Sequence, residues 1–334
     1  MRKVFIREML SNSSLESCYH LRRTEVCKTI REVHSKIGEP VQIGEITFLT
    51  TFNVVLSMLW GGSKFDDVKN QKGNSSLGAV FRAAITKMVE LMGKPNISDF
   101  FPVLARFDFQ GVEREMNEIL VVVEQLSENE DGAIQITMTQ IKALLMDIVV
   151  GGTDSTMMHN TEVMKKVQEE LADIVGMNNI VEESHLPKLL YLDVVVKETL
   201  RLHPTLPLPV PHFPSQSCVV GGYTILKGTR VFLNVWVMHR DPKILDNPSK
   251  FRPERFLGDG SKWDHTGNNF QYLPFGSKRR ICAGIPLAEK MVMYVLASLL
   301  HPFNWHLPEG EKLDLSEKFG IILTQRSFDL NLYA

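Results

Sequence analysis

A run of prolines divides the chain into two parts of different character. The run consists of Pro204, Pro207, Pro209, Pro211 and Pro214. A residue before proline is pushed out of the α region, so the helix predicted for residues 192–202 must stop before Pro204. We expect one domain over residues 1–334, with a helical part over about residues 1–205 and a part with β-hairpins, loops and a final helix over about residues 206–334.

Hydrophobic periodicity predicts the helices. Apolar-patterned stretches at residues 49–60 and 112–126 each predict one. Residues 141–150 contain only two charged side chains and predict a helix buried deep in the core. Between residues 161 and 175 apolar positions recur at helical spacing, which is typical of an amphipathic helix. The apolar run at 291–300 is ten residues long, too short to cross a bilayer, and predicts a core helix.

The second part of the chain also carries the alternation of β-strands. Residues 218–235 alternate around Leu226-Lys227-Gly228, as a β-hairpin does, and residues after Gly320 alternate in the same way. The expected fold class is therefore mainly α with a minor β part.

Charge and cysteine spacing exclude several classes of protein. The chain has 37 Lys and Arg residues against 39 Asp and Glu, so it lacks the basic excess of a nucleic-acid-binding protein. None of the four cysteines forms a C-x-x-C pair, which favours a reducing compartment over a disulfide scaffold. No apolar block follows the first basic residues, so we expect no signal peptide or membrane anchor here, and a soluble or peripheral chain.

Cys282 differs from the other cysteines in where it stands. It ends a glycine-containing, basic loop just ahead of an apolar helix that has Pro286 in its first turn. The unsatisfied N–H groups and dipole of that helix, with Arg279 and Arg280 beside them, favour a thiolate. The remaining cysteines, Cys18, Cys27 and Cys218, are expected to be small packed residues.

A stable thiolate is a nucleophile or a metal ligand. No general base stands near Cys282 in the sequence, although a distant histidine stays open as one, and no further nitrogen or sulfur ligand has the spacing of a zinc site. One thiolate without companion ligands suits haem iron, which takes a single axial cysteine.

Three motifs, in order along the chain, resemble those of the cytochromes P450. Glu198 and Arg201 match E-x-x-R on one helix face, and Arg255 lies in a P-E-R-F element. The loop that ends at Cys282 matches the haem-binding signature F-x-x-G-x-R-x-C-x-G at four positions, namely Phe275, Arg280, Cys282 and Gly284. The resemblance covers essentially the whole chain and is greatest to plant microsomal enzymes of the group that includes flavonoid and geraniol hydroxylases.

The resemblance implies a haem b site. Cys282 would be the axial ligand of the iron, and the cofactor-binding residues would be Phe275, Gly284, Arg280, His212 and Arg2, the last three at the propionates. For His212 an ordinary loop histidine is an equal alternative. Glu198, Arg201 and Arg255 would form a buried ion triad that fixes the segment before the cysteine loop. The His239-Arg240-Asp241 triplet is also found in the family, where it is structural.

The central helix ends in a stretch similar to the family's oxygen-binding motif. After Gly151-Gly152 come an acid and two hydroxyls, Asp154, Ser155 and Thr156, which would relay protons to the oxygen chemistry. Taken alone, the same residues fit a helix C-terminus followed by an ordinary loop equally well. The family motifs that follow downstream favour the functional interpretation.

The implied activity is that of a haem-thiolate monooxygenase. It inserts one oxygen atom of O2 into a small lipophilic substrate, terpenoid or phenolic, with electrons from an NADPH-dependent cytochrome P450 reductase. Leu206, Leu208 and Ile321 would line the substrate pocket, or belong to the core. Lys278 and Arg279 would form part of the reductase-docking face. The family implies the cytosolic face of the endoplasmic reticulum membrane.

Three departures from the family pattern motivate an alternative. The chain is expected to lack the family's N-terminal anchor and first elements, to be shorter by roughly ten residues, or about three helical turns, between Thr156 and Thr161, and to carry Lys278 where the signature has glycine. If that backbone needs φ > 0, a lysine there is strained. The alternative is a non-catalytic P450 remnant that binds haem poorly or not at all. A haem isomerase or dehydratase is a further option.

Overall fold

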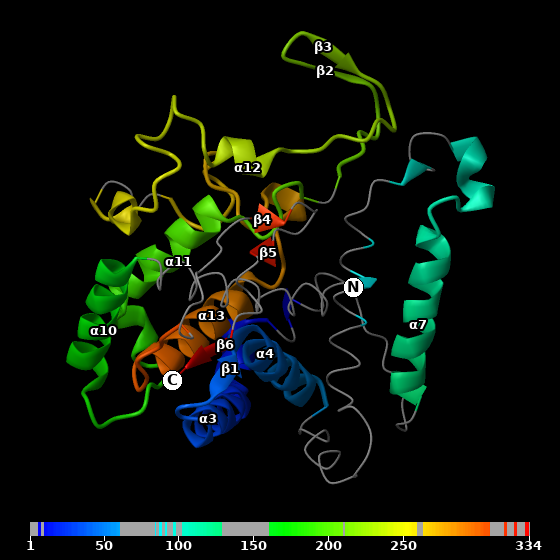
Figure 1. The fold of residues 1–334 in the computed structure, drawn as a ribbon. Coiled ribbons are helices and arrows are strands. Elements are labelled where there is room, and N and C mark those ends of the chain that lie inside the picture. The colour runs from blue at the N-terminus through cyan, green and yellow to red at the C-terminus, as the bar shows by residue number, and fades with distance from the viewer. Residues whose placement is uncertain are drawn as a thin grey trace.

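Helix α13 (Ile285–Leu300) is buried in the main body of the molecule (Figure 1), where three of the long helices pack against it, α3 (Tyr19–Ser35), α10 (Thr161–Val175) and α11 (Leu190–Leu202). This computed structural model describes residues 6–7, 10–60, 84, 87–88, 91, 96–97, 102–128, 160–209, 211–258, 263–307, 317–318, 324–325 and 331–333. From Met291 to Leu300 every residue of α13 is buried. The apolar run at 291–300 is therefore the core helix that the sequence predicts.

The helices predicted at residues 49–60, 112–126, 161–175 and 192–202 are present. The longer described helices are α3 (Tyr19–Ser35), α4 (Ile43–Trp60), α7 (Val112–Glu128), α10 (Thr161–Val175) and α11 (Leu190–Leu202), and shorter ones are α2 (Asn12–Ser17) and α12 (Val235–Met238). Single 3-10 turns are η2 (Pro102–Phe107), η3 (Leu186–Lys188), η4 (Pro253–Phe256) and η6 (Lys278–Arg280). Helix α11 ends two residues before Pro204, as predicted, and α4 begins six residues before the predicted stretch because the pattern continues upstream to Ile43. The helix predicted at 141–150 lies outside the described residues.

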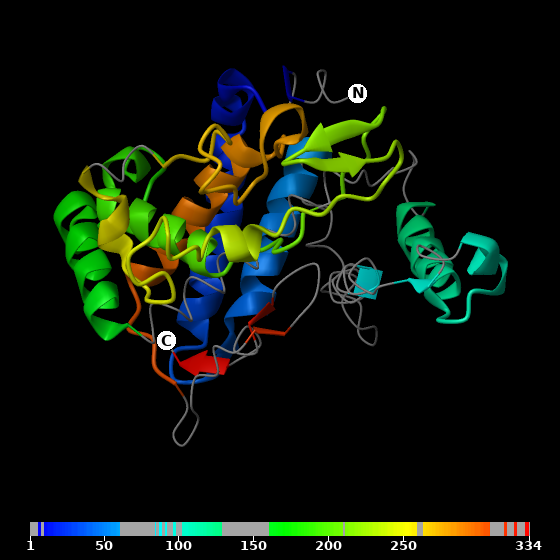
Figure 2. The same cartoon turned by 90° about the horizontal axis from the view of Figure 1, so that it is seen from above.

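Helix α10 shows how the pattern becomes packing. Its buried residues Val163, Val167, Leu171 and Val175 recur every fourth position and form one stripe. That stripe packs against α11 and α13, while α3 and α4 pack together, with α3 against α13 (Figure 2). Helix α7 lies across the molecule from α10 in both views (Figures 1 and 2).

The β part consists of three small antiparallel pairs. Strand β1 (Pro40–Gln42) pairs with β6 (Asn331–Tyr333), β2 (Cys218–Val220) with β3 (Tyr223–Ile225), and β4 (Glu317–Lys318) with β5 (Thr324–Gln325). The mainly α fold with a minor β part is thus confirmed. No helix in the described part of the chain has both the length and the apolarity needed to span a bilayer.

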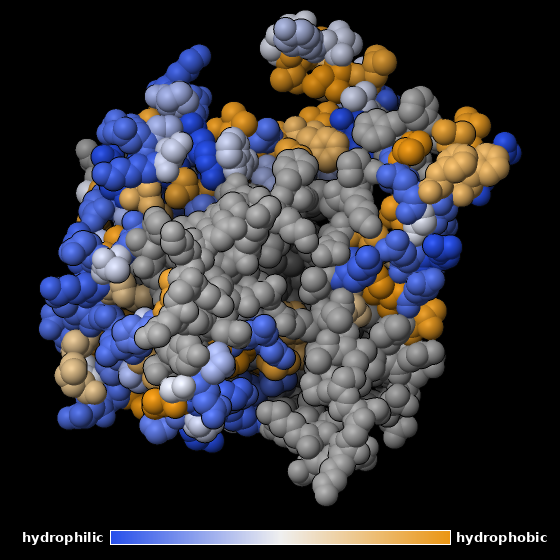
Figure 3. All heavy atoms as spheres, in the orientation of Figure 1, coloured by the Kyte–Doolittle hydropathy of each residue, from blue (hydrophilic) through white to orange (hydrophobic). Residues whose placement is uncertain are grey.

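The predicted position of the hairpin turn is wrong. The chain turns at Gly221-Gly222, with Val220 opposite Tyr223, and not around Leu226-Lys227-Gly228. Both glycines have positive φ, +58° and +85°, which is what a tight two-residue hairpin turn requires. Gly228, at φ +77°, belongs to a second turn, which the Thr229 N–H closes by donating to the Leu226 carbonyl at 3.1 Å. Figure 3 shows the hairpin projecting from the body of the molecule.

Candidate active site

The loop that carries Cys282 is held by backbone hydrogen bonds. The Cys282 N–H donates to the Phe275 carbonyl at 2.9 Å, which closes the loop on itself. The Cys282 Sγ accepts the N–H of Gly284, the residue before α13, at 3.4 Å. An added Cβ on Gly284 would lie 3.7 Å from that sulfur, so Gly284 lies directly beside it. The sulfur is therefore positioned at the N-terminus of the core helix, and the Cys282 residue is only half-buried.

The backbone of Lys278 is in the left-handed region. Its φ is +52°, a value at which a side chain is strained and glycine is not. The loop around Lys278 is hydrogen-bonded: the Arg280 N–H donates to the Ser277 carbonyl and the Ile281 N–H to the Lys278 carbonyl, at 3.3 Å each. The lysine thus adds strain to the loop without opening it.

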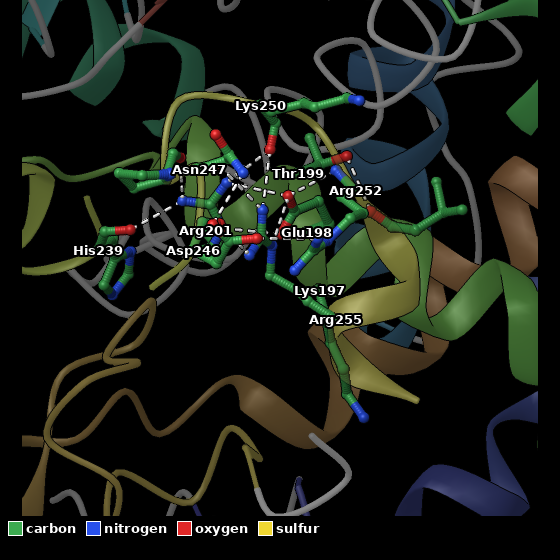
Figure 4. Close-up of polar contacts among 12 residues, drawn as sticks. Lys197, Glu198, Thr199, Arg201, His239, Asp246, Asn247, Lys250, Arg252 and Arg255 are labelled. Carbon is green, nitrogen blue, oxygen red and sulfur yellow. Dashed lines mark hydrogen bonds and ion pairs between the residues drawn. The ribbon is translucent and has the colours of Figure 1, made fainter. Parts of the chain in front are cut away.

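Glu198 accepts hydrogen bonds from two arginines in the interior (Figure 4). Arg201 donates two hydrogen bonds to the carboxylate, from Nε to Oε2 at 2.7 Å and from Nη2 to Oε1 at 2.9 Å. Arg255 Nε donates to Oε1 at 3.0 Å. The side chains of Glu198 and Arg201 are fully buried, and that of Arg255 is 5% exposed. Burial lowers the pKa of Arg255, while the Glu198 carboxylate opposes that shift. The contacts expected among the three residues are present.

The ion network also binds the backbone of the segment between α12 and η4. Arg201 Nη1 donates to the carbonyls of His239 and Pro248, both at 2.8 Å. Arg255 Nη2 donates to the Lys250 carbonyl at 3.0 Å, and the Arg252 N–H donates to Glu198 Oε1 at 2.8 Å. These bonds fix a passage that has almost no regular structure of its own.

His239 makes a contact that sequence reasoning missed. The imidazole is fully buried and stacks on Tyr272, with ring centroids 5.5 Å apart. Its Nε2 accepts the backbone N–H of Leu273 at 2.8 Å. Burial is the main cause that lowers the pKa of His239 to about 3. The only sequence signal was the His239-Arg240-Asp241 triplet, which said nothing of a partner.

A second histidine, His265, contacts the cysteine loop, and its side chain is 10% exposed. The His265 ring meets the Phe275 ring edge to face, with centroids 5.4 Å apart. His265 also lines a cavity of about 390 Å³ with Asp193, Lys197, Asp264 and Glu289, among others. Burial, and then the charge of Lys197, lower the pKa of His265 to about 4.

The donor set around Cys282 fits a haem group. Nowhere in the described ranges do three His, Cys, Asp or Glu side chains gather in a way that could hold a metal ion, so Cys282 stands as a single ligand. Cys282 is exposed in part, Phe275 of the same loop is aromatic, and Arg280 is exposed and pairs with no carboxylate of the described residues. These residues match the parts of an iron porphyrin: a thiolate for the iron, an aromatic ring for the macrocycle and a guanidinium for the acidic propionates.

The remaining predicted site residues are only partly described. Leu206 and Leu208 are half-buried in the proline-rich passage. His212 is exposed, and its backbone exchanges two hydrogen bonds of 2.9 Å with Val231. Cys218 is exposed at the start of β2, so its predicted packing is wrong. The predictions for Arg2, Asp154, Ser155, Thr156 and Ile321 lie outside the described residues.

Comparison with known proteins decides the family. The cytochrome P450 family model matches residues 120–332. This chain belongs to the cytochrome P450 family. A flavonoid 3'-monooxygenase of Petunia hybrida is 34% identical over 367 residues, which cover 97% of this chain and 71% of that enzyme. A geraniol 8-hydroxylase of Catharanthus roseus is also 34% identical, over 97% of this chain and 72% of the enzyme.

Solved structures show the same P450 fold. A zebra fish cytochrome P450 solved with progesterone superposes with a TM-score of 0.74 at 21% identity, covering 99% of this chain and 79% of that one. The match to the Petunia enzyme runs over 367 residues, more than the 334 of this chain, so that enzyme has residues within the matched region that this chain lacks. The family is one of haem-iron oxidoreductases, and its plant hydroxylases act in secondary metabolism.

Proposed function

We propose that this P450 inserts one oxygen atom of O2 into a small lipophilic substrate, terpenoid or phenolic, with electrons delivered from NADPH by a cytochrome P450 reductase. The observation that carries the proposal is the placement of Cys282. This half-buried residue places its sulfur beside the Gly284 N–H at the start of α13, inside a loop closed by the Phe275 carbonyl. Haem b, when bound there, supplies the redox chemistry that activates dioxygen.

In this proposal the chain's own residues hold the haem, line the substrate pocket and deliver protons. Cys282 would provide the sulfur ligand of the iron, and the exposed Arg280, with His212 and Arg2, would bind the propionates. Phe275 and Gly284 would contact the haem. Asp154, Ser155 and Thr156 relay protons, and the apolar side chains that line the substrate pocket are Leu206, Leu208 and Ile321.

The test of the haem site is spectroscopic. The full chain is expressed with haem supply, reduced, and exposed to carbon monoxide, and a red-shifted Soret band is expected from thiolate ligation. Cys282→Ala should abolish that band. Cys218→Ala is the matched control, because Cys218 is an exposed residue of β2 and should leave the band intact. A band that survives Cys282→Ala, or no band in folded wild-type chain, would contradict the proposal.

The reductase partner is tested by charge reversal. Lys278 and Arg279 are exposed beside the cysteine loop, where positive charge speeds encounter with an acidic partner more than it tightens the complex. Arg279→Glu should slow reduction of the haem-loaded chain at low salt by about tenfold, and the difference should shrink at high salt because salt screens exposed charges. The control Lys243→Glu reverses an exposed charge next to the ion network instead. Equal slowing by both variants would refute a docking face at this loop.

The substrate class is tested by turnover. Reconstituted with NADPH and a plant reductase, the chain is offered a monoterpene alcohol in one reaction and a flavonoid in another. A product heavier by one oxygen atom, formed only with NADPH, supports monooxygenation and identifies the class. Consumption of either compound without NADPH, or a product without added oxygen, would contradict it.

A further inference from the structure

His239 lies between the buried ion network and the cysteine loop and bonds to both. Its carbonyl accepts Arg201 Nη1 at 2.8 Å (Figure 4). Its imidazole Nε2 accepts the Leu273 N–H at 2.8 Å. The imidazole points away from the network (Figure 4). One residue thus connects Arg201 to the segment that leads to Cys282.

Leu273 is the first residue of the turn that supports Cys282. Its carbonyl accepts the Gly276 N–H at 3.2 Å, so the turn spans residues 273–276. Pro274, which has no N–H, follows it, and Phe275 then offers the carbonyl that binds the Cys282 N–H at 2.9 Å. The position of Phe275, and with it that of Cys282, therefore depends on where Leu273 is held.

His239 is fixed on its own side as well. It ends α12, and its N–H donates to the Val235 carbonyl at 2.9 Å. The Arg201 bond and the stack on Tyr272 hold its backbone and its ring. Tyr272 is itself fully buried and donates from its hydroxyl to the Lys197 carbonyl at 3.1 Å. A side chain held this firmly can set the position of the amide that it binds.

We infer that His239 is a positioning residue for the cysteine ligand: through the Leu273 N–H it transmits the geometry of the Glu198–Arg201 pair to the turn that carries Cys282. The inference rests on the proposed haem site and extends it, because it assigns His239 a specific role in positioning the ligand. It requires an acceptor at the position of Nε2. Burial keeps the ring neutral, and Nε2 then accepts while the proton resides on Nδ1.

The inference is tested by two amide variants that differ by one methylene group. The glutamine oxygen of His239→Gln reaches the position of Nε2, whereas the asparagine oxygen of His239→Asn reaches only that of Nδ1. We measure hydrogen–deuterium exchange along the full chain and the share of red-shifted Soret band after reduction with carbon monoxide. The exposed His306→Gln is the control.

With His239→Asn, exchange should rise about tenfold or more in the peptide over residues 269–282, because a buried amide loses its acceptor, while α11 and α13 change little. The red-shifted band should fall in the same variant. His239→Gln should restore both readouts, and the control should resemble wild type.

Three results would overturn the inference. They are wild-type exchange at 269–282 in His239→Asn, an equal rise over the whole chain in both amide variants, and a loosened loop with an undiminished band. If His239→Asn does not fold, loosened exchange at 269–282 in His239→Gln overturns it and wild-type exchange there supports it. If the wild-type chain gives no red-shifted band, the proposed haem site fails, and exchange alone decides whether His239 holds the loop.

Discussion

The ammonium of Lys278 lies 5.2 Å from the centroid of the Phe270 ring, although the Lys278 backbone is in the left-handed region at φ +52°. Two opposing effects therefore meet at one residue. The left-handed conformation costs a residue with a side chain on the order of 1 kcal/mol. An exposed cation–π contact returns about 0.5–1 kcal/mol. The strain that the sequence predicts at this position is thus largely offset by a contact that it did not predict.

A double-mutant cycle separates the two effects. In wild type, Lys278→Gly should change the free energy of unfolding by less than about 1 kcal/mol, because the relief of strain and the lost contact nearly cancel. In a Phe270→Leu background the same change should stabilise by about 0.5–1 kcal/mol more than it does in wild type. Urea unfolding monitored by circular dichroism measures both. Identical effects in the two backgrounds would show that the ring contributes nothing.

The ion network gives a second prediction. Glu198→Gln removes the negative charge that two buried guanidinium groups share, and it should lower the free energy of unfolding by about 3–5 kcal/mol, because uncompensated buried charge is costly. Glu254→Gln is the matched control, since Glu254 belongs to the same P-E-R-F element but is 42% exposed and pairs with Lys166. That change should cost less than about 1 kcal/mol. Chemical unfolding midpoints of the two variants, each compared with wild type, measure these costs. Equal midpoint shifts in Glu198→Gln and Glu254→Gln would refute a buried role for Glu198.

Much of this arrangement could be predicted because it is local. The bounds of α10 follow from a four-residue apolar repeat, and Glu198 and Arg201 are close because three residues separate them on one helix. The hairpin turn was misplaced because two turn signals, Gly221-Gly222 and Leu226-Lys227-Gly228, lie within one alternating stretch. The chain turns at both places, but only the Gly221-Gly222 turn connects two paired strands.

The contacts that sequence reasoning missed join distant segments through backbone groups. The bond from the Leu273 N–H to His239 spans 34 residues, and backbone donors carry no signature in a sequence. The same holds for Glu170, whose carboxylate accepts the Tyr191 N–H at 2.6 Å and the Leu192 N–H at 3.0 Å. A residue of one helix thereby caps the next helix, where a local capping residue would be expected but Leu189 offers none.

The cap supplied by Glu170 gives a third prediction. Glu170→Ala leaves the first amides of α11 without an acceptor and should lower the free energy of unfolding by about 1–2 kcal/mol. Because α11 carries Glu198 and Arg201, the red-shifted Soret band of the haem-loaded chain should also melt at lower temperature. The neighbouring Glu169→Ala serves as control, since Glu169 is 63% exposed and lies 3.9 Å from Lys165. Melting curves in which the two variants coincide would exclude the capping role.

The fourth prediction concerns acid stability and His265. Burial, followed by the charge of Lys197, lowers the pKa of this histidine to about 4, against an ordinary value near 6.5. Between these two values the unfolded chain binds a proton that the folded chain does not, so the free energy of unfolding falls as pH falls. The loss should approach about 3 kcal/mol near pH 4 and then level off.

Other groups near His265 act on the same pH range, so the prediction is a difference between two proteins. The Glu289 carboxylate lies 3.9 Å from His265 Nε2, and burial raises its pKa, which stabilises the folded chain as the pH falls. The nearby Asp264 has a lowered pKa because Thr266 hydrogen-bonds to it, which acts in the opposite sense at lower pH. His239, with its pKa of about 3, adds a loss of the same sign as His265.

His265→Phe isolates the contribution of His265. The phenyl ring can keep the contacts with Phe275 and Tyr272, and it removes Nδ1, a buried atom that has no hydrogen-bond partner among the described residues. At pH 7 the variant should therefore be at least as stable as wild type. Unfolding measured from pH 7 to pH 4 should show a shallower decline in the variant, with a difference that grows to about 3 kcal/mol at pH 4. Parallel pH curves would mean that His265 does not titrate differently in the folded and unfolded chains.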